Sequence, residues 1–448
     1  MPPIQPSSPG LPPPGFGARL LRFWLSWRML VIGTAGFLAG YLAMWNVQFQ
    51  LIWLVAACIP AGISCLRKSG VLGLTRDPIM VLAGAFILWN LAVGLVRNPE
   101  TLSLEYTQEF LAGTILLPVY LTILWLVCRR GEGASILLQT VVWAGLAAAA
   151  GGLLYWWLVQ TVEEPGARLR NPLVHGGLHP VTTGITIGFA VMAAAVWYGK
   201  TSTVRMRWAI AGSIAVMCLA VMLTLCRGAL FALSIAFLVP GPALLASVSL
   251  KSAWKQVWPP TAIAAAVVFG FLLFGGALAP KPGEIDEASS GNTMLTDDPL
   301  REYFSRGDSG RASFYRCGIE SLDTWDKHLT GAGLWGPELT LEAETGGNIN
   351  HFHSLFVATY IHSGIIGSAI LAALLALAVR RASTLARAGQ PQWLVLLVYG
   401  LAVLINDGQS ACSLVTHARF ENLVLWFPLV AIAASWRNGE NRREITSG

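Results

Sequence analysis

Arginine and histidine side chains stand between long apolar runs, and these residue types suit a phosphate-bearing substrate. Arg227 lies in a tight turn between two apolar runs, where a charge is costly and is therefore a functional candidate. Arg311 opens an amphipathic segment, and His353 closely precedes another apolar run. Arginine offers a phosphate two parallel donors and a permanent charge, whereas a neutral histidine can accept a proton. These three residues are the predicted catalytic residues.

Each of them also has a plainer interpretation. Arg227 could extend to a lipid phosphate, and Arg311 could be a solvated helix end. His351 and His353 could be interfacial histidines; on an extended segment they would point the same way. With Ser354 as an N-cap, His353 would lie beside a helix N-terminus, where the dipole disfavours the imidazolium and favours an anion. This placement suits a general base next to a phosphate.

Six further residues are predicted to bind substrate, because they fall in the same connecting segments. They are Arg170, His179, His351, Arg316, Asp407 and Arg419. Arg170 and His179 could complete a clamp around a phosphate, and Asp407 could orient a histidine or pair with an arginine; interfacial residues or plain helix ends would look the same. Asp297 and Asp298 lie in an acidic loop without a partnering pattern, and no CxxC pair occurs. We therefore expect no metal site and no cofactor.

Membrane helices are the elements that must position these residues. The chain has 448 residues, of which 54% are hydrophobic and 12% are charged. A soluble chain carries about 25% charged residues, so this composition excludes a soluble enzyme and a disordered chain. We count roughly a dozen apolar runs and predict an all-α polytopic membrane protein with about 12 transmembrane helices. The runs begin near Met29, Leu51, Met80, Leu111, Ser135, Val181, Trp208, Gly228, Val257, Leu355, Trp393 and Phe420.

The predicted domain boundaries follow these runs. Residues 1–18 are expected to form a disordered cytoplasmic leader, 19–279 transmembrane helices 1–9, 280–353 a large periplasmic loop, 354–437 transmembrane helices 10–12, and 438–448 a cytoplasmic tail. Within the loop, apolar residues recur at three- and four-residue spacing from Arg311 to Trp325, which predicts an amphipathic helix. Gly331 and Gly333 should then end it.

The distribution of basic residues predicts the sidedness. With a cytoplasmic N-terminus, every inner segment holds at least two lysines or arginines. The positive-inside rule therefore puts both termini in the cytoplasm and the predicted site residues on the opposite face. The net charge of +6 is explained by this topology, so no nucleic-acid partner is expected.

Several motifs resemble those of the O-antigen ligase and O-antigen polymerase superfamily. His353-Ser354 followed by Gly364 and Gly367 resembles its His-Asn…Gly-x-x-Gly signature, although Ser354 stands where the family usually has Asn. Cys226-Arg227-Gly228-Ala229 resembles its Ser-Arg-Gly-Ala turn between two helices, and the segment from Gly310-Arg311 to Gly336 resembles the loop that precedes the histidine motif.

This resemblance implies an inverting, metal-independent glycosyltransferase in the bacterial inner membrane, with its active site facing the periplasm. It would move O-antigen glycan from an undecaprenyl-diphosphate-linked donor to lipid A–core, among membrane lipids. His353 would activate the acceptor, and the arginines would stabilise the departing diphosphate. An O-antigen polymerase that joins lipid-linked repeats is the alternative. A transporter or flippase is less favoured, because it would carry ionisable residues near the mid-membrane, whereas here they lie mostly at the outer edge.

Overall fold

A computed structural model gives the arrangement of the helices. It describes residues 16–44, 46–69, 72–97, 104–164, 167–174, 179–238, 262, 311–333, 352–407 and 420–436. All regular structure within these ranges is helical, in agreement with the predicted all-α class. Residues 1–15 of the expected leader, the expected ninth run near Val257 apart from residue 262, and the expected tail lie outside the described residues, whereas residues 16–18 are helical and not part of a disordered leader.

The first half of the bundle contains α1 (Phe16–Trp24), α2 (Trp27–Ala43), α3 (Val47–Trp53), η1 (Leu54–Cys58), α4 (Ile59–Ser69), α5 (Leu72–Thr75), α6 (Pro78–Arg97), α7 (Leu104–Cys128), α8 (Gly131–Tyr155), η3 (Trp156–Gln160) and α9 (Thr161–Glu163). The second half contains α10 (Pro180–Lys200), α11 (Val204–Leu223), α12 (Arg227–Leu238), α16 (Arg311–Glu320), α17 (Trp325–Thr330), α19 (Leu355–Arg387), α20 (Gln392–Asp407) and η4 (Asn422–Trp426).

The number of membrane crossings is smaller among the described residues than the sequence predicts. Six helices are long and apolar enough to cross a membrane, or seven if the bent pair α1 and α2 forms one span. Shorter apolar helices occur at Ile115–Cys128, Arg227–Leu238, Gln392–Ile405 and Asn422–Trp436, each at a place where an apolar run is predicted. The chain is thus a multi-pass membrane protein, while the count of twelve stays a prediction.

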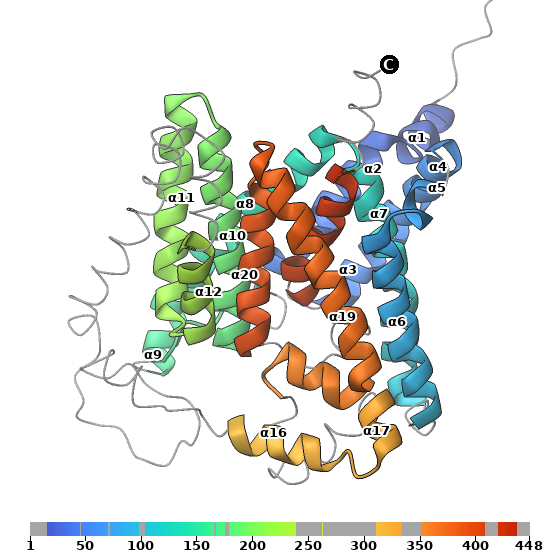
Figure 1. The fold of residues 1–448 in the computed structure, drawn as a ribbon. Helices are drawn as coiled ribbons and strands as arrows, with labels where there is room; N and C mark the ends of the chain where they lie inside the picture. The colour runs from blue at the N-terminus through green and yellow to red at the C-terminus, as the bar shows by residue number, and fades with distance from the viewer. Residues whose placement is uncertain are drawn as a thin grey trace, which may run out of the picture.

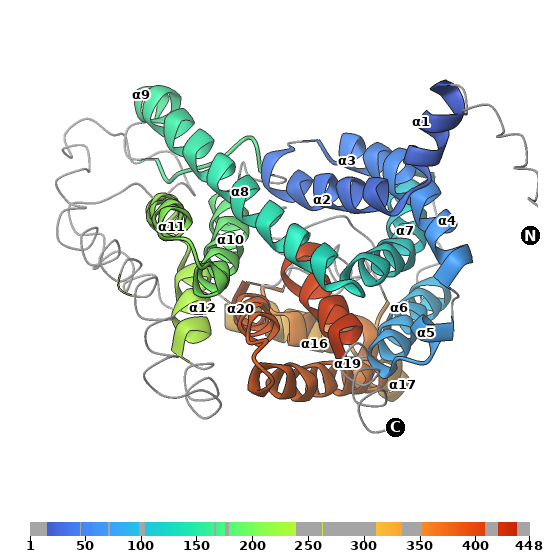
Figure 2. The same ribbon diagram turned by 90° about the horizontal axis from the view of Figure 1, so that it is seen from above.

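Helix α8 is central to the packing of the bundle. It runs between α2 on one side and α10 and α11 on the other (Figure 2). Helix α20 packs against α10, α12 and α19, and α19 in turn packs against α6. Buried hydrogen bonds join these layers: the Tyr399 hydroxyl of α20 donates to the Ile185 carbonyl of α10 at 2.8 Å. Such bonds help to hold helices together where lipid removes the hydrophobic driving force.

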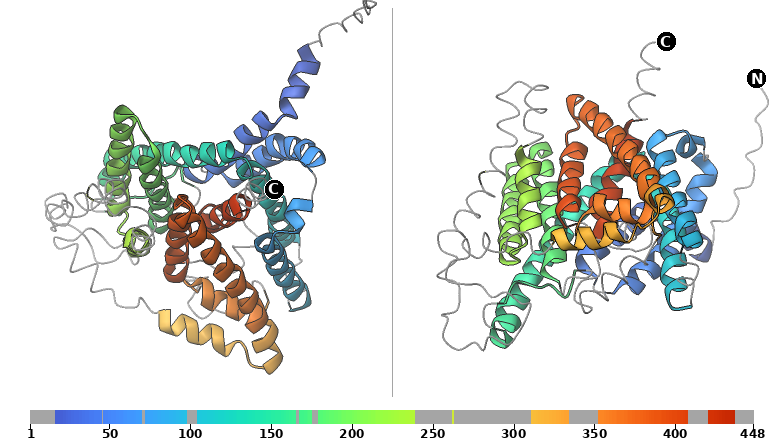
Figure 3. Two further views of the ribbon diagram at one scale, coloured as in Figure 1. Left: turned by 45° about the horizontal axis from the view of Figure 1, so that its top comes forward. Right: turned by 60° about the horizontal axis from the view of Figure 1, so that its bottom comes forward.

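The two ends of the bundle differ. Helices α16 and α17 lie across one end, beyond α19 and α20 (Figures 1 and 3). At the opposite end, α19 and α6 are joined by a buried ion pair in which Arg381 lies 2.8 Å from Asp77. Asp77 also accepts a hydrogen bond from the backbone of Ile79. A buried charge is tolerated only with such partners, so this pair ties the two helices together.

The amphipathic helix predicted from Arg311 to Trp325 is instead two helices. Helix α16 ends at Glu320, and α17 starts at Trp325, whose side chain is 71% exposed. In the connection between them, the Ser321 hydroxyl donates a hydrogen bond to the Gly318 carbonyl at 2.6 Å, and the Leu322 side chain is buried. The apolar spacing of the sequence therefore describes α16, but Trp325 was wrongly assigned to the same apolar face.

Helix α19 is broken at Gly364, which has φ +64° and ψ −166°. The end of α17 enters this break, where the backbone N–H of Ala332 donates to the Ile361 carbonyl at 2.8 Å. A Cβ atom at Gly364 would lie 2.3 Å from the Leu329 carbonyl oxygen. Glycine is required here by both conformation and space. The break thus joins the loop helix α17 to the first part of α19, just beyond His353.

Candidate active site

His353 lies immediately before α19 in an unusual backbone conformation. Its φ is +52°, in the left-handed region that side chains seldom adopt. The neighbouring residues explain how it is held: Phe352 is fully buried against Phe314 and Ile361, and Ser354 occupies the N-cap position of α19. An extended backbone was expected at His351 and His353. His353 is not extended, because its left-handed conformation turns the chain. Ser354 is at the expected N-cap position but makes no capping hydrogen bond with its side chain.

The surroundings of His353 keep its ring neutral. The ring stacks on Phe314 of α16, with centroids 6.3 Å apart and planes at 29°. Burial lowers the pKa of His353 to about 4, and the positive charge of Arg311, then that of His179 in its protonated form, adds to this effect. A neutral imidazole at pH 7 can accept a proton. The structure therefore brings together His353, Arg311 at the start of α16 and His179 at the start of α10.

His179 extends this cluster toward a basic segment. It occupies the N-cap position of α10, and part of its ring stays open to solvent. Partial burial, and then the charges of Arg168 and Arg170, lower the pKa of His179 below its ordinary value. The three arginines disfavour the protonation of both histidines and attract anions, so the surroundings of His179 and His353 favour a negatively charged ligand.

Arg168 and Arg170 are held in different ways. The Arg168 side chain donates to the Thr224 carbonyl at 2.8 Å, while Arg170 forms an ion pair with Glu164 at 2.9 Å. The backbone N–H of Arg170 also donates to the Gln160 side chain at 3.0 Å. Arg168 was not among the predicted site residues, although it stands two positions before one of them. The presence of two arginines, Arg168 and Arg170, in that short segment is the sequence feature that could have indicated Arg168.

Arg227 is the first residue of α12, as the predicted tight turn requires. Leu225, two residues earlier, has φ +49°. The backbone N–H of Leu169 donates to the Leu223 carbonyl at 2.9 Å, so the segment with Arg168 lies against this turn. On α10, a Cβ atom at Gly184 would lie 2.8 Å from that of Cys226. Arg227 is thereby placed at the same end of the bundle as His179, with its side chain half-buried.

The remaining predicted residues are less informative. Arg316 is exposed on α16, away from the buried face that carries Phe314. Asp407 is the last residue of α20, and its side chain lies outside the structure's description. His351 and Arg419 also lie outside the described residues. Their roles stay predictions.

The cluster is best suited to bind an anion next to a neutral base. It combines permanent guanidinium charges with two histidines of lowered pKa. Within the described ranges, no three His, Cys, Asp and Glu side chains are grouped so that they could hold a metal ion. The fold and this site together define a multi-pass membrane protein with a cluster of arginine and histidine side chains at one end.

A comparison with protein families shows what part of the chain is similar to. A family model described as O-antigen ligase matches residues 212–372, from α11 into the second part of α19. The matched range includes Arg227, Arg311 and His353, so this part of the chain is similar to the O-antigen ligase family. The family covers ligases and polymerases, which are glycosyltransferase-like enzymes of O-antigen and lipopolysaccharide assembly. A search of curated proteins found no match.

Proposed function

We propose that this protein is an inverting, metal-independent glycosyltransferase that moves O-antigen glycan from undecaprenyl diphosphate to lipid A–core. The observation that carries the proposal is the cluster of Arg311, His179 and His353, where burial and the adjacent positive charges lower the pKa of His353 to about 4. The family match supports the lipid-linked glycan as the substrate class.

His353 acts as the base in the proposed reaction. An acceptor hydroxyl attacks the anomeric carbon from the face opposite the diphosphate, which inverts the configuration. The new C–O bond forms as the bond to the diphosphate oxygen breaks, and the hydroxyl proton passes to His353. Its low pKa makes it a weak base in the free enzyme, but the bound diphosphate carries negative charge that raises the pKa and improves proton transfer.

The arginines stabilise the leaving group. A diphosphate leaves as an anion, so it needs positive charge more than a proton. Arg311 beside His353 and Arg227 at the start of α12 supply permanent charge, and Arg170 joins them when the diphosphate competes with Glu164. We propose that this charge replaces a metal ion. Activity that persists in EDTA is the expected result.

Reconstitution tests the proposal directly. The purified full-length protein is placed in vesicles with lipid-linked glycan and lipid A–core, and glycan on lipid A–core is measured. We expect His353→Ala to lower the rate by 100-fold or more, since general base catalysis contributes about 10²–10⁴-fold. Lys327→Ala is the control, because its exposed pair with Asp323 contributes little.

The outcome also separates the alternatives. A polymerase would lengthen the lipid-linked glycan when lipid A–core is omitted, whereas a ligase would form no product. A flippase would move the donor across the vesicle membrane without forming a glycosidic bond. Full activity of folded His353→Ala protein would contradict the assignment of the base.

A further inference from the structure

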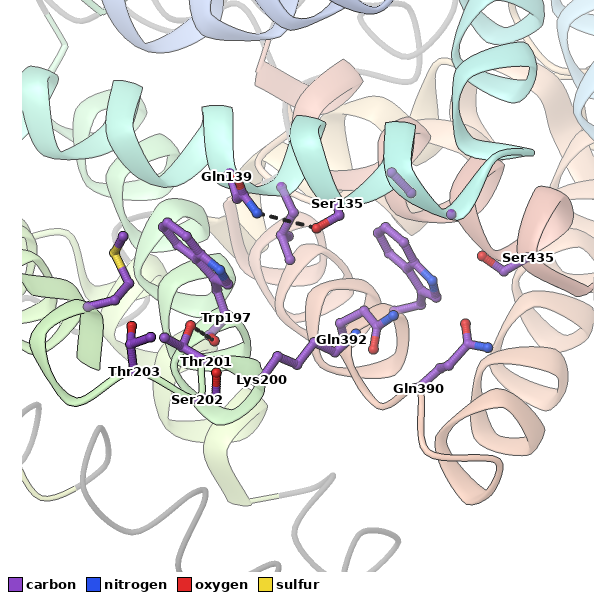
Figure 4. Close-up of a pocket in the computed structure, with 15 residues that line it drawn as sticks. Ser135, Gln139, Trp197, Lys200, Thr201, Ser202, Thr203, Gln390, Gln392 and Ser435 are labelled. Atoms are coloured by element: carbon purple, nitrogen blue, oxygen red, sulfur yellow. Dashed lines mark hydrogen bonds between the residues drawn. The ribbon is translucent and has the colours of Figure 1, made fainter.

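A second polar site lies at the end of the bundle opposite His353. It is a cavity of about 530 Å³ among the ends of α8, α10, α11 and α20 (Figure 4). Its volume falls in the range of sites for small ligands, about 300–1,000 Å³. The polar groups that line it include Ser135, Lys200, Thr201, Ser202, Gln392 and Trp393.

Three helices begin at the wall of this cavity. Gly131 is the first residue of α8, Thr203 is the N-cap of α11, and Gln392 is the first residue of α20. The first N–H groups of a helix lack carbonyl partners within that helix and carry the positive end of its dipole. Three such ends around one cavity favour an anion.

Lys200 adds a full positive charge. It is the last residue of α10 and extends toward Gln392 in the view of Figure 4. Among the described residues, no aspartate or glutamate lines the cavity, and none forms an ion pair with Lys200. The cavity therefore carries positive charge that its own described residues do not neutralise.

Two buried polar atoms belong to residues that line this cavity. Trp393 is only 2% exposed, yet its indole N–H has no hydrogen-bond partner within the described part of the chain. Gln392 is 6% exposed, and its amide oxygen also lacks a partner there. A buried donor is normally satisfied by protein or by bound water. A half-turn of the Gln392 amide would present its NH₂ group, so both side chains can donate to a ligand.

We propose that this cavity binds a phosphate group, carried by an anionic phospholipid or by inorganic phosphate. Lys200 ends the apolar span Pro180–Lys200, and Gly131 and Val204 begin two further spans, so the cavity lies at headgroup depth. Basic pockets between transmembrane helices recognise anionic headgroups at this depth. The proposal concerns the end of the bundle opposite His353, and it does not depend on the proposed glycosyl transfer.

Lipid retention tests the proposal. The full-length protein is extracted from vesicles of phosphatidylglycerol or phosphatidylcholine, and the retained lipid is counted by native mass spectrometry. We expect Lys200→Gln to lower phosphatidylglycerol retention at least fivefold, with phosphatidylcholine unaffected. Trp393→Phe keeps the ring but removes the N–H, and we expect a smaller loss of about two- to threefold. Arg205→Gln is the matched control, because Arg205 is exposed in the first turn of α11 and does not line the cavity.

Inorganic phosphate distinguishes the two sources. Detergent-solubilised, delipidated protein is heated with and without 10 mM phosphate, with an equal ionic strength of chloride as the reference. A phosphate-dependent rise in Tm that Lys200→Gln abolishes would assign the site to free phosphate, whereas a response to phosphatidylglycerol alone would assign it to a headgroup. Should Lys200→Gln fail to fold, Trp393→Phe is used in its place. The proposal is overturned if neither probe binds, or if the variants bind both probes as the parent protein does.

Discussion

The low pKa of His353 has a consequence that can be measured in the free enzyme. A base must be neutral, and His353 stays neutral down to a pH near 4. We therefore expect kcat/KM for the lipid-linked donor to change less than about twofold between pH 7 and pH 5. An ordinary histidine of pKa 6.5 would lose about 25-fold over this interval. A loss of that size would show that the ring is not held as the structure describes.

Arg311 supplies part of this effect, so its removal should shift the profile. Replacing Arg311 with glutamine removes a positive charge near His353, which raises the pKa of the ring. The acid limb of kcat/KM should then move to higher pH, whatever the loss in absolute rate. An acid limb at unchanged pH would show that the charge of Arg311 does not influence the pKa of His353.

The shape of the arginine side chain makes a separate prediction. Arg311→Lys keeps the charge but loses the planar, two-pronged donor that matches a phosphate. We expect kcat/KM to fall by about 10- to 100-fold, which corresponds to about 1.4–2.8 kcal/mol of transition-state stabilisation. Lys327→Arg, in α17, is the control for the reverse exchange. Near-normal turnover of Arg311→Lys would exclude a bidentate contact.

At the scale of elements, the break in α19 is the feature that positions His353. Gly364 has a positive φ and no room for a Cβ atom beside the Leu329 carbonyl. We expect Gly364→Ala to lower stability by more than the roughly 1–3 kcal/mol of a strained backbone, because the clash adds to it. Thermal unfolding in detergent measures this. Gly212→Ala in α11 is the matched control, since nothing lies within 4 Å of its added Cβ.

This break also shows how far the sequence could be interpreted. The sequence showed Gly364 and Gly367 as parts of a motif, and spacing alone could not tell a glycine that allows close helix packing from one that breaks a helix. The apolar spacing after Arg311 correctly indicated a helix, yet it extended that helix through Trp325. A solvent-exposed tryptophan has the same sequence signal as a buried one. Long apolar runs are strong evidence for helices, whereas the turns between them depend on tertiary contacts.

The site residues could be predicted from the sequence only because charged residues gather in the segments that connect the membrane helices. Arg311, His179 and His353 were selected because they lie in connecting segments on one predicted side. The structure adds what the sequence cannot express: the left-handed backbone of His353, the Phe314 ring beside it and the hydrogen bond that Arg168 makes to Thr224. These depend on contacts between residues far apart in the chain.

At the scale of the whole molecule, the prediction to be tested is which side of the membrane each polar end of the bundle faces. Basic residues predict that the cavity with Lys200 faces the cytoplasm and the His353 cluster faces the periplasm. Single cysteines at Arg205 and at Asp323 report on the two ends, because both side chains are exposed. Their labelling by a membrane-impermeant maleimide is compared in intact and permeabilised cells.

The background for this experiment lacks Cys65, Cys317 and Cys412, of which the first two are partly exposed. We expect Asp323→Cys to react in intact cells once the reagent has crossed the outer membrane, and Arg205→Cys to react only after permeabilisation of the inner membrane. The reverse pattern would place the His353 cluster in the cytoplasm. Transfer to a periplasmic acceptor would then be impossible, even if the cluster binds a diphosphate, so this measurement tests the direction of the chemistry independently of its residues.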